Sequence, residues 1–94
     1  MLKLPPFSQG QRIGLFGGSF NPAHEGHRMV ALYALKRLQL DWVWWLVSPQ
    51  NPLKDTKETG EYSQRLLFTK SVANHPKFIV TDIEKQIHSR NTAQ

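Results

Sequence analysis

A seven-residue run near the middle of the chain most constrains the fold. Residues 41–47 read DWVWWLV, which is almost continuously apolar and lacks the alternation of a strand with one exposed face. The run ends at Ser48 and Pro49, a pair typical of a turn. Strands without alternation are usually buried on both faces in parallel sheets that helices cover. The run therefore predicts a central parallel strand in an α/β protein.

The neighbouring segments predict two more strands and two helices. Residues 12–16 (RIGLF) and 77–82 (KFIVTD) have the short apolar pattern of strands, and residues 51–60 have loop composition. Residues 25–39 and 62–74 show the apolar spacing of helices. The residues expected to face inward are Val30, Ala31, Ala34, Leu35 and Leu38 in the first helix, and Leu66, Leu67, Thr69, Val72 and Ala73 in the second. Residues 83–94 are polar and receive no assignment.

The resulting order, β-α-β-α-β, predicts the N-terminal half of a doubly wound, Rossmann-like parallel sheet. If the strands lie in the order 3-2-1, right-handed crossovers put both helices on one face of the sheet. The other face would then expose either Trp42 and Trp44 or the alternate residues of the same strand. We therefore expect residues 1–94 to form one C-terminally truncated domain, or a homo-oligomer whose second copy covers the sheet.

Composition limits the partners of the chain. The 94 residues carry a formal net charge of +5 and include no cysteine, so disulfides and thiolate metal sites are excluded. The basic residues are scattered along the chain, which argues against nucleic acid as a partner. No apolar segment reaches the length of a membrane span. Residues 1–12, which we call the leader, contain prolines where a signal peptide would need an uninterrupted apolar run. These features predict a cytoplasmic protein with an anionic ligand and no membrane contact.

Residues 17–27, GGSFNPAHEGH, predict a phosphate-binding loop. Gly17 and Gly18 follow the first predicted strand and let the backbone approach a ligand without a Cβ in the way. The loop leads into a helix that begins near Glu25, and the free N–H groups at a helix start attract phosphate. Gly26 is expected to leave room for a base or sugar against the first turn.

Two histidines flank the start of this predicted helix. His24 lies at or just before its first turn and His27 lies one turn further on, so both imidazoles can donate to the same phosphates. Taken alone, His27 also fits a buried structural histidine, because it falls in line with Ala31 and Ala34. A metal site is the weaker interpretation, because no third ligand lies nearby in the sequence, and we predict none.

The same segment resembles a known signature. GGSFNPAHEGH is similar to the G-G-[ST]-F-[DN]-P-x-H-x-G-H motif of the nucleotidyltransferase superfamily, which shares its H-x-G-H element with class I aminoacyl-tRNA synthetases. Residues 43–54 (VWWLVSPQNPLK), followed by Ser63 and Arg65, resemble one branch of it, the bacterial nicotinate-nucleotide adenylyltransferases. The resemblance extends from about residue 11 to the last residue.

The resemblance implies a reaction and a set of site residues. ATP and nicotinate mononucleotide would give nicotinate adenine dinucleotide and pyrophosphate in NAD biosynthesis, with Mg²⁺ bound through the phosphates. The implied catalytic and ATP-binding residues are Gly17, Gly18, Ser19, Phe20, His24, Gly26 and His27. The implied substrate-binding residues are Lys54, Arg65 and Thr92, with Arg65 orienting the loop of residues 17–20 that seats both nucleotides. For Lys54 and Arg65, a solvated surface charge is the simpler alternative.

Two departures from the family pattern limit these expectations. Asn91 stands where the family usually has an aromatic residue before the threonine that matches Thr92. The family's second phosphate-binding element, a Ser-Thr-rich turn followed by an arginine, has no counterpart here, so we expect the 94-residue chain alone to be inactive or weakly active. The alternatives are an adenylyltransferase with nicotinamide mononucleotide or phosphopantetheine as acceptor, or a non-catalytic nucleotide- or RNA-binding module.

Overall fold

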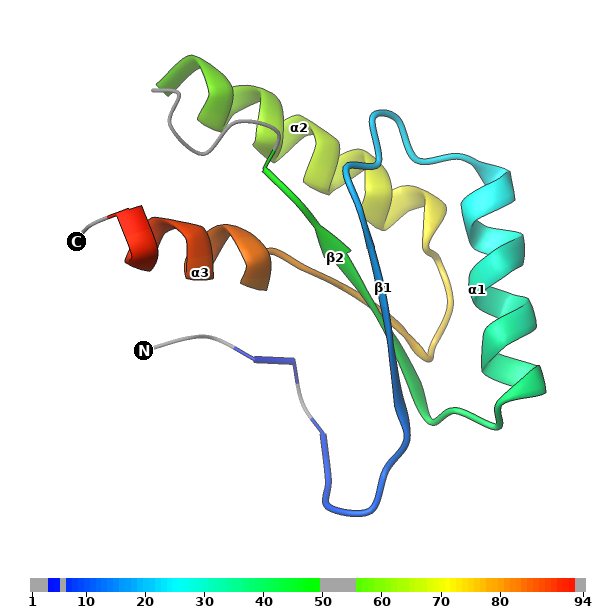
Figure 1. Ribbon diagram of the computed structural model, residues 1–94. Helices are drawn as coiled ribbons and strands as arrows, with labels where there is room; N and C mark the ends of the chain where they lie inside the picture. Colours follow the sequence, from blue (N-terminus) through cyan, green and yellow to red (C-terminus); the bar gives the residue numbers. More distant parts are fainter. Residues whose placement is uncertain (1–3, 6, 50–55, 93–94) are drawn as a thin grey trace.

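Strands and helices alternate along the whole chain in the computed structural model, which describes residues 4–5, 7–49 and 56–92. The elements are β1 (Ile13–Gly18), α1 (Glu25–Arg37), β2 (Trp42–Val47), α2 (Thr56–Val72), β3 (Phe78–Thr81) and α3 (Ile83–Thr92). Figure 1 shows the strands side by side with the helices packed around them. Within the described residues, no helix is both long enough and apolar enough to cross a bilayer.

The three strands form one parallel sheet in the order β1-β2-β3, with β2 in the centre. Ile13 pairs with Trp42 at one end of the β1 ladder and Gly18 pairs with Val47 at the other, while Val43 pairs with Phe78 in β3. The predicted α/β class, the central position of residues 41–47 and the strand order are all confirmed. The carboxyl ends of all three strands therefore lie at one edge of the sheet.

Side chains of β2 alternate between a core face and an outer face. Val43, Trp45 and Val47 are buried in the main cluster, together with Ala31 of α1 and Tyr62 of α2. Because these three residues share one face of the strand, α1 and α2 cover the same face of the sheet, as right-handed crossovers require. Figure 1 shows α3 and the N-terminal segment on the other side of the strands from α1.

The expectation of a bare outer face is wrong at β2. Trp44 is only 8% exposed, and its ring packs edge-on against Phe7 with 6.0 Å between centroids. Gln11 Oε1 accepts a hydrogen bond from the indole of Trp42 at 2.9 Å. The leader folds back over this face, and α3, the segment that received no assignment, also contacts β2. The outer side of β1 is open among the described residues, where Leu15 is 66% exposed.

Both long helices differ from their predicted limits or faces. Thr56 begins α2, so the second half of the predicted loop 51–60 is helical, with Gly60 inside the helix. Val30, Leu38 and Leu67 were expected to face inward, but they are 58%, 53% and 67% exposed. Apolar residues occur on more than one side of these helices, so periodicity alone does not identify the buried face.

Candidate functional site

The loop between β1 and α1 lies at the carboxyl edge of the sheet, and we call residues 17–20 the phosphate loop. A Cβ added at Gly17 would meet no atom within 4 Å, so the space beside this backbone is open. Phe20 adopts a positive φ of 49° and buries its ring against Phe16 and Trp45, with centroid distances of 5.4 Å to each. Only the backbone of Phe20 is therefore available to a ligand, because its side chain anchors the loop in the core.

His24 is the N-cap of α1, and its ring is held by the backbone. His24 Nδ1 accepts a hydrogen bond from Gly26 N at 3.1 Å, and His27 Nδ1 accepts one from His24 N at 3.0 Å. This reciprocal arrangement is a capping box built from two imidazoles. Because each Nδ1 is an acceptor, the neutral form of each ring carries its proton on Nε2. Both Nε2–H groups are therefore free to donate to a ligand.

The two rings lie close together at the start of α1. Their centroids are 3.9 Å apart, and the ring of His27 also packs edge-on against Phe20 at 5.1 Å. Burial lowers the pKa of His27 below its ordinary value of 6.5, and the neighbouring charge of His24 lowers it further. His27 is partly exposed, so it is not the fully buried structural histidine that the apolar stripe allowed.

Gly26 gives space to the imidazole of His24, and its expected role beside a base or sugar stays a prediction. A Cβ at this position would lie 2.9 Å from His24 Cε1 and 3.0 Å from His24 Nδ1. The absence of a Cβ at Gly26 therefore makes room for the imidazole of His24. Within the described residues no group of three His, Asp or Glu side chains could hold a metal ion.

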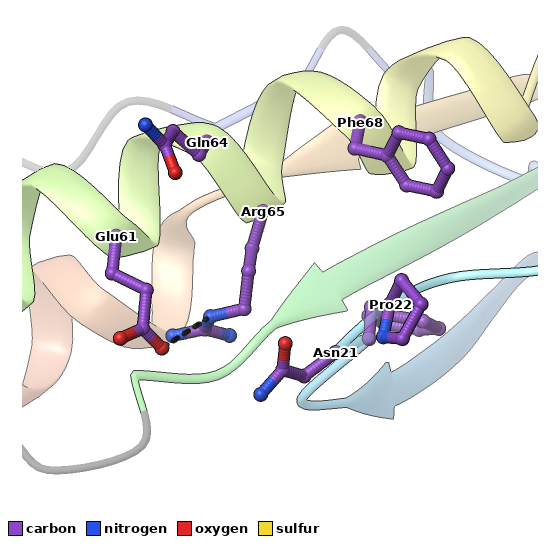
Figure 2. A pocket seen from close by; sticks show the side chains of 7 residues that line it. Asn21, Pro22, Glu61, Gln64, Arg65 and Phe68 are labelled. Carbon is purple, nitrogen blue, oxygen red and sulfur yellow. Dashed lines mark ion pairs between the residues drawn. The ribbon is translucent and has the colours of Figure 1, made fainter.

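Arg65 of α2 is buried at the same edge of the sheet and is not a surface charge. Its side chain is 5% exposed, and Nη1 donates to Ser19 O at 2.7 Å and to Ser48 O at 3.0 Å. Glu61 Oε1 lies 3.8 Å from Nε. Figure 2 shows the guanidinium of Arg65 extending from α2 toward the loop, between Glu61 and Asn21. The interpretation of Arg65 as a solvated helix charge is therefore wrong.

A pocket of about 170 Å³ lies between this loop and α2. Its lining comes from residues 20–22 and from Glu61, Gln64, Arg65 and Phe68. Figure 2 shows Asn21 and Pro22 facing these α2 side chains across the pocket. The pocket and the histidine pair flank the phosphate loop.

The end of β2 is held by residues that the sequence analysis did not identify as part of the site. Tyr62 donates its hydroxyl to Val47 O at 2.7 Å, and burial raises the pKa of Tyr62, so the phenol remains protonated. Ser48 donates its hydroxyl to Glu84 of α3. Lys85 Nζ lies 4.8 Å from the centre of the Tyr62 ring. The one available signal was the spacing of Tyr62 and Arg65, which puts them on one side of a helix.

Two of the predicted substrate residues lie where side chains are not described. Lys54 falls outside the described residues. Thr92 is the last residue of α3, and the structure describes its backbone only. The structure thus brings together the end of β1, the following loop and the start of α1, with Arg65 contacting the loop from α2. The predicted residues there are Gly17 and Gly18, which the structure places in the last two positions of β1, and Ser19, Phe20, His24, Gly26 and His27.

A parallel α/β sheet whose first strand ends in glycines just before a histidine-capped helix has the arrangement of a Rossmann-like nucleotide-binding fold. The chain belongs to the cytidylyltransferase-like family, whose family model matches residues 15–92.

Curated relatives narrow the comparison. The protein of Mesorhizobium japonicum named "Probable nicotinate-nucleotide adenylyltransferase" is 49% identical over 90 residues, covering 96% of this chain and 46% of the relative. Proteins with the same name from Brucella suis and Roseobacter denitrificans are 52% and 48% identical, covering 86% and 95% of this chain and 42% and 44% of those relatives. The chain therefore spans less than half the length of these relatives.

Proposed function

We propose that this chain carries the ATP-binding part of a nicotinate-nucleotide adenylyltransferase. The observation that supports this most strongly is the imidazole capping box, which leaves two Nε2–H donors beside the phosphate loop and the start of α1. The names of relatives at about half identity support the acceptor, nicotinate mononucleotide. The cytoplasmic location expected from the sequence is part of the same proposal, as is an oligomer or further sequence that covers the open side of β1.

The proposed reaction needs no protein nucleophile. A phosphate oxygen of nicotinate mononucleotide attacks the α-phosphorus of ATP and forms a new P–O bond, while the bond from that phosphorus to the α,β-bridging oxygen breaks. Pyrophosphate leaves with the electron pair, and nicotinate adenine dinucleotide is formed. Catalysis then consists of aligning two anions and neutralising charge on the transferred group. His24 and His27 donate to the phosphates of ATP, and Gly17 permits their approach.

Mg²⁺ fits this site as an ion carried by the substrate. Imidazole and backbone N–H groups suit phosphate oxygens, whereas Mg²⁺ prefers oxygen ligands and usually binds through substrate phosphates. When bound, the ion neutralises phosphate charge. Lys54 and Thr92 remain assigned to the acceptor nucleotide on the resemblance alone.

The experiment is a comparison of acceptors with the natural full-length protein. Dinucleotide formation from ATP is measured by chromatography with nicotinate mononucleotide, nicotinamide mononucleotide and phosphopantetheine. A kcat/KM at least tenfold higher for nicotinate mononucleotide is expected, and an equal or higher value for another acceptor would overturn the choice. The 94-residue chain alone is expected to bind ATP and to turn over weakly or not at all. Salt-dependent binding of RNA without ATP binding would favour the non-catalytic module.

A further inference from the structure

The parallel ladder between β1 and β2 continues beyond its last backbone rung through a side chain. Ser48 N donates to Gly18 O at 2.9 Å, which is the final backbone bond between the two strand ends. One residue further on, the carbonyls of Ser19 and Ser48 cannot bond to each other, because both are acceptors. Nη1 of Arg65 donates to both oxygens, at 2.7 and 3.0 Å. The guanidinium therefore forms one additional rung that joins the two chain segments.

Stability alone does not explain this arginine. The side chain is 5% exposed, and within the described residues Nε and Nη2 have no hydrogen-bond partner. The Glu61 carboxylate is half exposed and lies 3.8 Å from Nε, too far for a hydrogen bond. A buried cation with incomplete partners is commonly less stable than an apolar residue of similar size. Its position between two backbone segments indicates a geometric role.

One of the two segments that Arg65 joins is the phosphate loop, and the other leads along the sequence to Lys54, which the resemblance assigns to the acceptor. Ser19 belongs to the phosphate loop, which connects through Phe20 and Ala23 to the histidine cap of α1. Ser48 begins the segment that leads from β2 toward α2. Neither segment has another strand of the described residues to fix its separation from the other beyond the rung at Gly18.

Resting on the proposed function, we propose that Arg65 is a positioning residue. Nη1 holds Ser19 of the phosphate loop and Ser48 at the end of β2 at a fixed separation, and it does so without touching either nucleotide. The separation of these segments sets the distance between the attacking phosphate and the α-phosphorus of ATP. A displacement of about 1 Å in such an alignment costs on the order of 100-fold in rate.

The test compares three variants in the natural full-length protein by steady-state kinetics. Arg65→Lys retains the charge, but its ammonium is shorter and lacks the planar fork that reaches both carbonyls. It is expected to lower kcat by about 10- to 100-fold while each KM changes less than about threefold. Arg65→Gln, which also removes the charge, is expected to lower kcat further. A rise in KM for one nucleotide with kcat unchanged would indicate a substrate contact and overturn the proposal.

Two matched controls separate positioning from general loosening. Tyr62→Phe removes the neighbouring bond from α2 to Val47 O and keeps the ring, so it is expected to lower the unfolding temperature and to leave kcat within about threefold. Lys70→Gln removes an exposed cation from the same helix and is expected to change neither quantity. A loss of kcat in Tyr62→Phe equal to that in Arg65→Lys would overturn the proposal. Thermal unfolding identifies any variant that fails to fold.

A readout without turnover keeps this inference separate from the proposed function. If the wild-type protein forms no dinucleotide, the proposed function fails. Backbone amide NMR then tests Arg65. Arg65→Lys is expected to shift the amide signals of Phe20, which shares a peptide group with Ser19 O, and of Ser48, because Pro49 has no amide proton. Lys70→Gln is expected to leave both signals in place. Unchanged signals in Arg65→Lys would overturn the role of Arg65 itself.

Discussion

The histidine pair of α1 and the arginine of α2 use their nitrogens in opposite ways. His24 and His27 each give one ring nitrogen to the backbone and keep the other, Nε2, without a backbone partner. Arg65 directs Nη1 to two backbone carbonyls and is buried. Under the proposed function, the histidines are the groups that meet a ligand, and Arg65 is the group that holds the loop. Substitution of a histidine should therefore affect nucleotide binding and rate, whereas substitution of Arg65 should also affect the stability of the fold.

The largest expected effect is on activity when the histidine donors are removed without breaking the cap. His24→Asn and His27→Gln keep a side-chain oxygen that can accept the capping bonds, because Asn is a good N-cap and Gln at N3 suits a capping box. Each is expected to lower kcat/KM for dinucleotide formation by about 10²- to 10³-fold. The free energy of unfolding, measured in urea, should change by less than about 0.5 kcal/mol. A loss of stability that parallels the loss of activity would contradict the assignment of the histidines to the ligand and of Arg65 to the loop.

The next effect is on stability when Arg65 is removed. Arg65→Ala leaves the carbonyls of Ser19 and Ser48 without their donor and is expected to lower the free energy of unfolding by about 2 kcal/mol. Lys70→Ala in the same helix is the control and should change it by less than about 0.5 kcal/mol. Denaturant unfolding followed by circular dichroism measures both. Equal stability of the two variants would show that the guanidinium does not hold the loop.

A smaller effect is expected from a methyl group at Gly17. Its Cβ would enter open space, so Gly17→Ala should fold normally but lower ATP affinity about tenfold, or about 1.4 kcal/mol, in isothermal titration calorimetry. Gly14 of the same strand is the control, because its Cβ would lie 2.6 Å from Leu40 Cδ1. Gly14→Ala should therefore lower stability. Unchanged ATP affinity in Gly17→Ala would remove this backbone from the ligand site.

The smallest effect is the pH dependence of stability from His27. The folded chain holds the pKa of His27 below the ordinary 6.5, so below pH 6.5 the unfolded chain binds more protons. The free energy of unfolding should therefore fall as the pH drops through 6.5 and stop falling below the lowered pKa. Urea unfolding between pH 7.5 and 5 measures this, and His27→Gln should have a weaker slope. An identical slope in the variant would assign the dependence to other groups.

Local patterns predicted the part of the site that is contiguous in sequence. The loop and the helix start lie within residues 17–27, so glycine sterics and helix-end chemistry predicted them locally, whereas the roles of His24 and His27 rested on the family resemblance. Arg65 could not be assigned in this way, because its partners Ser19 and Ser48 are 46 and 17 residues away. Contacts of that kind depend on which face of α2 meets the sheet, and the exposed Leu67 shows that apolar spacing chose that face imperfectly.

The sheet was predicted more completely than its covering. The apolar continuity of residues 41–47 was sufficient for a central parallel strand, and crossover handedness was sufficient for the side of α1 and α2. The covering of Trp44 depends on Phe7 in a proline-containing leader and on the polar helix α3. Prolines interrupt the first of these segments, and isoleucines are the two apolar residues of the second, so neither shows a pattern that predicts packing on β2.

The packing of Phe20 on Trp45 gives the molecule an internal optical probe. Trp45 is fully buried directly beneath the phosphate loop, whereas Trp42 and Trp44 lie on the opposite face of the sheet. Indole emission depends on neighbouring rings and on local polarity, so movement of the loop at Phe20 should alter the fluorescence of one tryptophan of the three. Occupancy of the loop can then be followed in a cuvette without a labelled nucleotide.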